Sequence, residues 1–254
     1  MDELVQYQYM ADKGYGIITI NRAKKRNAIS IAMAKRFMSC IEKAEKDPIM
    51  FLVVTGAGEH IFCAGGDLND LHGELTTEEA KKSLLNMMEV LYRLTVFKVP
   101  TIALLNGGAR GGGCELASAC DIRIGKTGTT FGFIQTKLGI IPGWGGGVLL
   151  AKRVHTSFAN QWIMEGTIYN IEDLVQKGWI HRVVNHDEWK DWDSLLKPYL
   201  SKSPAQMRIL KEQYLEEIGV LGLKERMEKE VSHCASLWES KEHKDAVSAF
   251  LHRS

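Results

Sequence analysis

Three glycine-rich stretches contain the residues best suited to bind a ligand and act on it: TGAGEHIFCAGGDLNDL (55–71), NGGARGGGCELASACD (106–121) and GIIPGWGGG (139–147). Each lies at a predicted strand end or helix start, where backbone N–H groups lack intrahelical partners. Because glycine permits close backbone approach, the loops around Gly65-Gly66 and Gly111-Gly112-Gly113 could each offer one N–H to a single oxygen. Two such donors would stabilise an enolate or oxyanion made from a carbonyl, and losing one typically costs about 2.7–4 kcal/mol.

Other chemistries of glycine-rich loops are disfavoured by spacing. The sequence contains no G-x-G-x-x-G for a dinucleotide, no GxxxxGK[ST] for a nucleotide triphosphate and no G-x-S-x-G nucleophile elbow. The five cysteines form no CxxC pair and have no histidine at ligand spacing; they are Cys40, Cys63, Cys114, Cys120 and Cys234. Neither a disulfide framework nor a metal site is therefore expected, and a reducing compartment is the default expectation.

Composition limits the partners of this chain. Its 254 residues are 45% hydrophobic and 25% charged, with a formal net charge of +1, so nucleic acid and anionic membranes are not expected as partners. The N-terminus lacks a basic region followed by an apolar run, and no stretch of about 18 apolar residues occurs, so a cytoplasmic protein is expected. The basic run of Arg22, Lys24, Lys25 and Arg26 is by itself typical of a solvated loop.

Hydrophobic patterning predicts an α/β core in the first part of the chain. Residues 4–10 and 15–22 resemble a strand pair, and the runs 51–56 and 101–107 are typical of strands buried on both faces. Helices are predicted over 31–47, with Ser30 as N-cap, over 76–97, behind a threonine cap, and over 114–121. Strands separated by helices favour parallel pairing with right-handed crossovers.

From about Trp144 onward the pattern is mostly helical. Helices are predicted over 148–166, 172–179, 186–200, 204–219 and 223–239, with one possible last strand over 180–185. No low-complexity linker separates the two parts. The aromatic and methionine positions of this helical part are interpreted as core and subunit interface.

Four segments in order resemble the crotonase superfamily, that is, the enoyl-CoA hydratase/isomerase family: NRAKKRNAIS (21–30), IFCAGGDL (61–68), IALLNGGARGGGCELASACDIRI (102–124) and FGFIQTKLGIIPG (131–143). The resemblance runs from about residue 4 to the C-terminal SAFLHR, and the segment from Ile102 to Ile122 is highly specific. It implies an α/β fold of the ββα spiral type. The spiral core would cover residues 1–195 and a helical trimerisation region residues 196–254, giving a homotrimer or a dimer of trimers.

The same resemblance implies an acyl-CoA thioester substrate and no cofactor beyond the coenzyme A of that substrate. Its carbonyl oxygen would lie between the amides of Gly66 and Gly112, with Glu115 as a catalytic acid/base. Glu115 follows Cys114 and precedes Leu116, so burial and a raised pKa are plausible. The remaining positions implied to bind the acyl-CoA are Lys25, Asn27, Ala28, Ala64, Asp67, Leu68, Gly111, Pro142 and Gly143. A CoA bound nearby would be a negatively charged partner for the basic run from Arg22 to Arg26.

One position departs from the hydratase pattern. Hydratases of this family use two glutamates, and the second would fall at Gln135, twenty residues after Glu115. An amide cannot exchange a proton at neutral pH, and acid–base catalysis typically supplies about 10²–10⁴-fold, so efficient hydration is not expected. No other acid occurs in 131–147, and Glu74, Glu78 and Glu79 are candidates only if their segment folds over the site.

Several one-carboxylate reactions stay open. An isomerase would move a proton between two carbons, and a decarboxylase of a methylmalonyl- or ethylmalonyl-CoA type thioester would protonate the enolate left by CO₂. The phrases IFCAGGDLND and LGIIPGWGGG resemble the ethylmalonyl-CoA decarboxylase branch. Thioester hydrolysis has no feature that selects it. A non-catalytic acyl-CoA binding member is the alternative from another class, and the retained Glu115 disfavours it.

Overall fold

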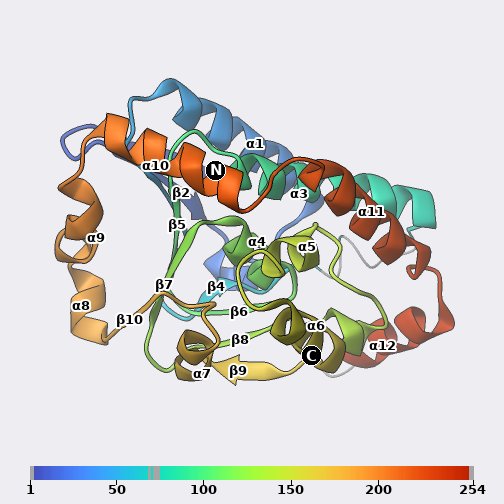
Figure 1. The fold of residues 1–254 in the computed structure, drawn as a ribbon. Helices are drawn as coiled ribbons and strands as arrows, with labels where there is room; N and C mark the ends of the chain where they lie inside the picture. Colours follow the sequence, from blue (N-terminus) through green and yellow to red (C-terminus); the bar gives the residue numbers. More distant parts are fainter. Residues whose placement is uncertain (1–2, 68–69, 71–74, 252–254) are drawn as a thin grey trace.

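The larger of two β-sheets forms the centre of the molecule. A computed structural model describes residues 3–67, 70 and 75–251 (Figure 1). The larger sheet has the order β1 (Val5–Met10), β2 (Tyr15–Ile20), β3 (Leu52–Gly56), β5 (Thr101–Leu105), β7 (Ile122–Lys126), β10 (Arg182–Val184). β1 pairs antiparallel with β2 and every later neighbour is parallel, as the alternation of strands and helices predicts.

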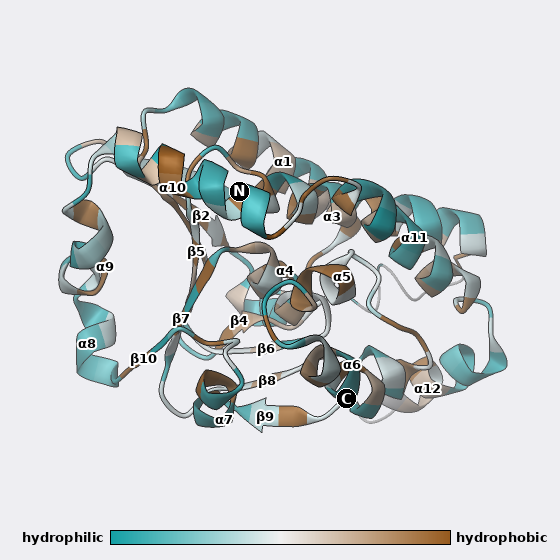
Figure 2. Ribbon diagram, viewed as in Figure 1, coloured by the Kyte–Doolittle hydropathy of each residue, from teal (hydrophilic) through white to brown (hydrophobic). Residues whose placement is uncertain are grey.

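Both faces of this sheet are buried, which explains the continuous apolar runs. Leu52 and Val54 of β3 belong to the larger core cluster, whereas Phe51 and Val53 belong to a second cluster on the opposite face. Helices α1 (Ile31–Lys46) and α3 (Thr77–Thr95) contribute to the first cluster, and α9 (Trp192–Leu200) and α10 (Pro204–Glu217) to the second. Figure 2 shows hydrophobic residues along the strands and hydrophilic ones over α8 (His186–Lys190) and α11 (Leu223–Ser236).

A second, smaller sheet lies beside the functional region. Its order is β4 (Ile61–Cys63), β6 (Gly108–Arg110), β8 (Thr130–Gly132), β9 (Ile168–Asn170), parallel except for β8 and β9. The sequence patterning did not predict this sheet. Its strands have three residues each, which is too short for a period to be recognised, and two of them lie within the glycine-rich stretches.

The remaining helices complete a mixed α/β fold with helices at its C-terminus. They are α4 (Gly112–Ala119), α5 (Gly146–Leu150), α6 (Thr156–Glu165), α7 (Ile171–Gln176) and α12 (Lys241–Leu251), with short 3₁₀ turns η1 (Ala23–Lys25) and η2 (Gln135–Leu138). α11 packs along α3 and against α5, and α12 packs on η2. The last two helices therefore return to the glycine-rich region.

Two predicted helices are each divided in the structure. The predicted helix over 148–166 is wrong as one unit, because His155 accepts a hydrogen bond from the Ser157 N–H and begins α6 anew after α5. The predicted helix over 186–200 is likewise divided, since Asp191 caps the start of α9 by accepting from the Ser194 N–H. Ser30 precedes α1 at its N-cap, and the predicted last strand is confirmed as β10. Local capping side chains decide both breaks.

Candidate active site

The two predicted glycine loops meet at one edge of the small sheet. Gly65 has a φ of +95°, and a Cβ atom there would lie 2.9 Å from the Arg110 carbonyl oxygen and 3.2 Å from the Gly112 nitrogen. Glycine is therefore required at position 65 for both its backbone conformation and this close approach. Within the described residues, neither the Gly66 N–H nor the Gly112 N–H has a hydrogen-bond acceptor. Both residues face one cavity.

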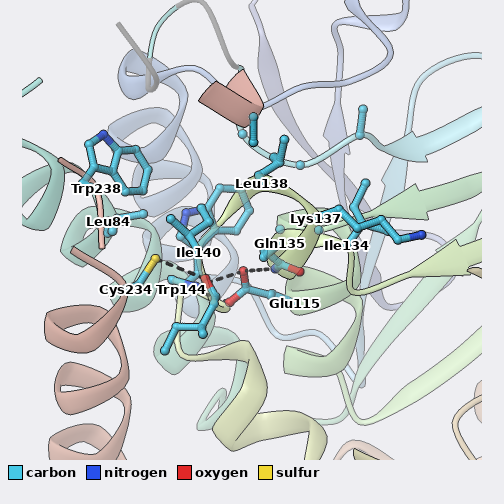
Figure 3. A pocket seen from close by; sticks show the side chains of 18 of the residues that line it. Leu84, Glu115, Ile134, Gln135, Lys137, Leu138, Ile140, Trp144, Cys234 and Trp238 are labelled. Atoms are coloured by element: carbon cyan, nitrogen blue, oxygen red, sulfur yellow. Dashed lines mark hydrogen bonds between the residues drawn. The ribbon is translucent and has the colours of Figure 1, made fainter. Parts of the chain in front are cut away.

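This cavity has a volume of about 430 Å³ and a largely apolar lining (Figure 3). The apolar side chains come from α3, η2 and its flanks, and the C-terminal helices; they are Leu84, Ile134, Leu138, Ile140, Ile141, Trp144, Trp238, Ala246 and Ala249. Lys137 is exposed at the same cavity, and its side chain extends away from Glu115. A cavity with apolar walls and a few polar groups is typical of a small-molecule site.

Glu115 is the carboxylate of the cavity. It lies on the first turn of α4 and is 2% exposed. Its Oε1 accepts hydrogen bonds from Gln135 Nε2 at 2.8 Å and the Gly143 N–H at 3.3 Å, and its Oε2 from the N–H groups of Trp144 at 2.8 Å and Gly146 at 2.9 Å. A carboxylate offers about four acceptor positions, so the protein occupies all of them.

Burial and hydrogen bonding act on the Glu115 carboxyl in opposite directions. Burial raises its pKa because the charged form loses solvation, while the backbone N–H groups of Trp144 and Gly146 and the Gln135 side chain lower it. Burial dominates, so the pKa of Glu115 is raised above its ordinary value. This direction agrees with the expectation drawn from its apolar sequence neighbours.

Gln135 begins η2 and faces Glu115 across the cavity. The residue is 7% exposed, and its Nε2 donates to Glu115 Oε1. Because a carboxylate can only accept hydrogen bonds, this contact turns the Gln135 Oε1 atom the other way. That oxygen is buried and has no hydrogen-bond partner among the described residues. The site therefore has a fixed donor toward Glu115 and a free acceptor beside it.

Trp144 was not among the predicted site residues. It is 3% exposed, lines the cavity and packs so closely on Gly112 that a Cβ atom there would lie 2.3 Å from the indole ring. In the sequence, Trp144 stands out only as part of the phrase LGIIPGWGGG. Its position places a large apolar ring directly beside the Gly112 N–H.

The structure brings together only some of the predicted binding residues. Ala64, Gly66, Gly111, Gly112, Glu115, Gln135 and Gly143 line the cavity, whereas Lys25, Asn27, Ala28, Asp67 and Pro142 do not. Leu68 lies outside the described residues.

The predicted residues away from the cavity have other contacts. Asn27 is 1% exposed and donates to the carbonyls of Ala57 and Ile61, while Asp67 pairs with Arg22 at 2.5 Å. These contacts fix the loop that carries Lys25, which is exposed in η1. This loop is also tied to the first glycine loop, since the Ala64 N–H donates to the Arg26 carbonyl.

The C-terminal helices supply site residues that sequence reasoning missed. Cys234, Trp238, Ala246 and Ala249 line the cavity from the α11–α12 region, where the sequence analysis expected only core and subunit interface. Glu230 of α11 is a further carboxylate near Glu115, and burial and then the Glu115 charge raise its pKa. No signal in the sequence places a C-terminal helix against a loop a hundred residues earlier.

Glu78 and Glu79, two other acids considered in the sequence, do not line this cavity. Glu78 and Glu79 are exposed, and Glu79 closes a capping box with Thr76 at the start of α3. Glu74 lies outside the described residues. Among the residues described, no cluster of histidine, cysteine, aspartate or glutamate could hold a metal ion. No helix in the described part of the chain is long and apolar enough to cross a membrane.

Sequence comparisons match this chain to one protein family. The family model described as enoyl-CoA hydratase/isomerase matches residues 11–254. The short-chain-enoyl-CoA hydratase of Clostridium acetobutylicum is 30% identical over 239 residues, which cover 93% of this chain and 91% of that protein.

Solved structures give the same fold. An enoyl-CoA hydratase from Bacillus halodurans superposes with a TM-score of 0.87 at 20% identity, covering 97% of this chain and all of that one. An enoyl-CoA hydratase from Thermoplasma volcanium has a TM-score of 0.76 at 30% identity, covering 97% of each chain.

Proposed function

Because the chain belongs to the enoyl-CoA hydratase/isomerase family of acyl-CoA enzymes, we propose that it forms a thioester enolate and moves a proton with one carboxylate, Glu115. The observation that carries the proposal is the 2.8 Å hydrogen bond from Gln135 Nε2 to Glu115 Oε1. At the position where a hydratase of this family has its second glutamate, this chain has Gln135, whose amide donates to Glu115. Isomerisation and decarboxylation need only one proton-transfer group, whereas efficient hydration in this family needs two.

The N–H groups of Gly66 and Gly112 hold the thioester oxygen in this proposal. Its support is that both line the cavity and that neither has an acceptor among the described residues. The enolate oxygen carries more charge than the thioester carbonyl, so two fixed donors stabilise the enolate more than the substrate. The N-terminus of α4 adds a favourable dipole at the same point.

Gln135 acts as a positioning residue for both protonation states of Glu115. When Glu115 is ionised, Gln135 donates to it through Nε2. When Glu115 has taken a proton, a half-turn of the amide brings Oε1 round to accept from the new O–H. An amide can follow the proton in this way without ever exchanging one itself.

The surroundings of Glu115 also disfavour the addition of water. Hydration in this family uses a second acid to activate the water, and at that position Gln135 has an amide, which exchanges no proton at neutral pH. The Trp144 ring fills the space beside Gly112 with apolar surface. A water next to the α- and β-carbons would therefore lack the partners that activate it.

Decarboxylation of a malonyl-type thioester is the second candidate, and the apolar lining favours it. A substrate carboxylate held against Trp144, Ile140 and Leu138 loses its hydration, which promotes release of neutral CO₂. The lone cation at the cavity within the described residues, Lys137, extends away from Glu115 and does not offset that desolvation. Glu115 then protonates the enolate.

The coenzyme A portion extends past the first glycine loop in this proposal. Lys25, Asn27, Ala28, Ala64, Asp67 and Leu68 form its path, with Asn27 and Asp67 acting by fixing the loop. Coenzyme A arrives with the substrate, so the proposed reaction needs no separate cofactor. The homotrimer or dimer of trimers implied by the family stays a prediction, which light scattering of the purified protein checks.

A panel of thioesters tests the proposed function. Purified protein is given crotonyl-CoA, a 3-enoyl-CoA, methylmalonyl-CoA and ethylmalonyl-CoA, and the products are identified by mass. We expect isomerised or decarboxylated product, lost in Glu115→Gln and kept in the exposed matched control Glu78→Gln. Rapid hydration of crotonyl-CoA that survives in Glu115→Gln would overturn the mechanism. Tight CoA binding without turnover of any thioester would favour a binding protein.

A further inference from the structure

A second carboxylate shares the turn that holds Glu115. Glu230 of α11 accepts hydrogen bonds from the Gly147 N–H at 3.1 Å and the Val148 N–H at 2.9 Å. Glu115 accepts from the Trp144 and Gly146 N–H groups of the same turn. Residues 144–148 at the start of α5 therefore donate to two carboxylates, one from α4 and one from α11.

The contact between this turn and the two acids is close. A Cβ atom on Gly147 would lie 2.5 Å from Glu230 Oε2, and one on Gly146 would lie 2.2 Å from the Glu115 Cβ. Glycine at these neighbouring positions is what lets both carboxylates reach the backbone. A shift of either acid must therefore move the turn that holds the other.

Electrostatics couples the same two groups. Glu230 as a residue is only partly buried, but burial of its carboxyl group and then the Glu115 charge raise its pKa to about 8. Cys234, one turn further along α11, has a raised pKa because of burial and then the charges of Glu115 and Glu230. Among the described residues, the titratable groups that face Glu230 are Glu115 on α4 and Cys234 on α11 itself. Helix α5 presents backbone N–H groups to it. On α3, the charge of Glu89 is paired with Lys224 at 2.7 Å.

We propose that Glu230 is a positioning residue of this site: it sets how residues 144–148 hold the Glu115 carboxylate and how readily that carboxylate takes a proton. Glu230 is not among the residues that line the cavity, so it acts through the shared turn. With Glu230 neutral, Glu115 alone carries the charge at the start of α5. When Glu230 ionises, a second negative charge lies on the N–H groups of Gly147 and Val148, next to those that hold Glu115, and its repulsion makes the charged form of Glu115 less stable. The inference rests on the proposed role of Glu115.

The contribution of Glu230 to the free energy of unfolding changes with pH in one direction. The pKa of Glu230 in the folded protein lies above its unfolded value, so the folded state binds the extra proton. The corresponding stability is fully present below the unfolded value of 4.5 and is lost as pH rises toward about 8. In Glu230→Gln this part of the pH dependence of unfolding is absent.

Carboxyl NMR tests the coupling without relying on turnover. Protein labelled with ¹³C at the glutamate carboxyl carbons is titrated, and the two signals are assigned by their loss in Glu115→Gln and Glu230→Gln. We expect Glu230 to titrate near pH 8, the Glu115 signal to change again at that pH, and Glu115→Gln to move the Glu230 midpoint to lower pH. A Glu230 midpoint at its ordinary value, or a Glu115 signal that does not respond to Glu230, would overturn the proposal. The wild-type titration and Glu115→Gln suffice if Glu230→Gln does not fold.

Kinetics supply the readout that a purely structural role would not change. Wild-type kcat should fall as pH rises through about 8, while KM changes little, and Glu230→Gln should lack this transition. Its amide keeps only one acceptor oxygen for the Gly147 and Val148 N–H groups, so the turn loosens and kcat at neutral pH should drop by about tenfold, a part of the roughly 10²–10⁴-fold that acid–base catalysis supplies. The exposed Glu228→Gln on the same helix should keep the wild-type profile. A transition retained in Glu230→Gln contradicts this inference alone, whereas absence of turnover in the wild type contradicts only the proposed function.

Discussion

At the scale of single residues, the pairing of Glu115 with the Gln135 amide distinguishes this site from one with two glutamates. The family resemblance assigned the position of the second glutamate to Gln135, twenty residues after Glu115, and in the structure the two side chains are joined by a 2.8 Å hydrogen bond. What no sequence pattern could provide is the direction of the amide and the occupation of all four acceptor positions of Glu115. These depend on backbone N–H groups whose positions only the folded chain fixes.

Substitution of Gln135 by glutamate tests the role of the missing second acid. Gln135→Glu places two carboxylates in contact, which raises their shared proton affinity, and should create or increase hydration of crotonyl-CoA. Loss of the enoyl absorbance measures this rate. Since the paired carboxyls hold protons above their unfolded pKa, the variant should also lose stability as pH rises above the unfolded carboxyl value of 4.5.

The exposed Gln176→Glu is the matched control for that variant. It should change neither the hydration rate nor the pH dependence of unfolding. An unchanged hydration rate in a folded Gln135→Glu protein would show that position 135 does not serve as the second acid here.

At the scale of elements, the site is built where short helices begin. α4 presents Glu115 in its first turn, and the start of α5 returns four N–H groups to Glu115 and Glu230. The sequence analysis recognised the glycine-rich stretches as places of close backbone approach. It did not predict that the third stretch would serve as the support for the carboxylate, because that depends on how α5 packs beside α4.

Gly146→Ala tests this support. The new Cβ would lie 2.2 Å from the Glu115 Cβ, so Glu115 or α5 must shift. We expect about 1–3 kcal/mol of destabilisation from overpacking and a fall in kcat of about 10²-fold from misplacement of Glu115. Urea unfolding and steady-state kinetics measure the two effects.

Gly178→Ala serves as the control for the glycine substitution. Its φ of +76° makes alanine strained by roughly 1–2 kcal/mol, yet nothing lies within 4 Å of the new Cβ. It should lose stability and keep wild-type kinetics. If Gly146→Ala behaved in the same way, the support role of this turn would be refuted.

At the scale of the whole molecule, two sheets and returning C-terminal helices enclose the site. Apolar runs such as 51–56 predicted the strands buried on both faces, because that environment selects apolar side chains without alternation. The three-residue strands of the small sheet and the placement of α11 and α12 over the cavity were not predicted, since both depend on tertiary contacts far apart in the sequence.

A buried ion pair ties α10 to the large sheet. Lys211 is 2% exposed, and its Nζ lies 2.6 Å from Asp121 Oδ2 and donates to the Thr95 carbonyl. Lys211→Met leaves the buried Asp121 with the two Thr101 donors and, among the described residues, only the longer 3.6 Å ion pair with Arg153, so we expect a loss of about 3–5 kcal/mol in urea unfolding.

The matched control for this pair is Lys190→Met. It breaks the exposed pair with Asp187, which solvent screens, and should cost far less free energy of unfolding than Lys211→Met. Equal effects of the two variants would mean that the buried pair does not anchor α10.

Exchange of the α-hydrogen of butyryl-CoA in D₂O, followed by mass, tests most directly whether Glu115 alone moves the proton. Isomerisation and decarboxylation share the enolate step, so either reaction predicts deuterium incorporation by the wild type. We predict that Glu115→Gln abolishes the exchange, and that Glu78→Gln, exposed and away from the cavity, retains it. Exchange at the wild-type rate in a folded Glu115→Gln protein would contradict the account.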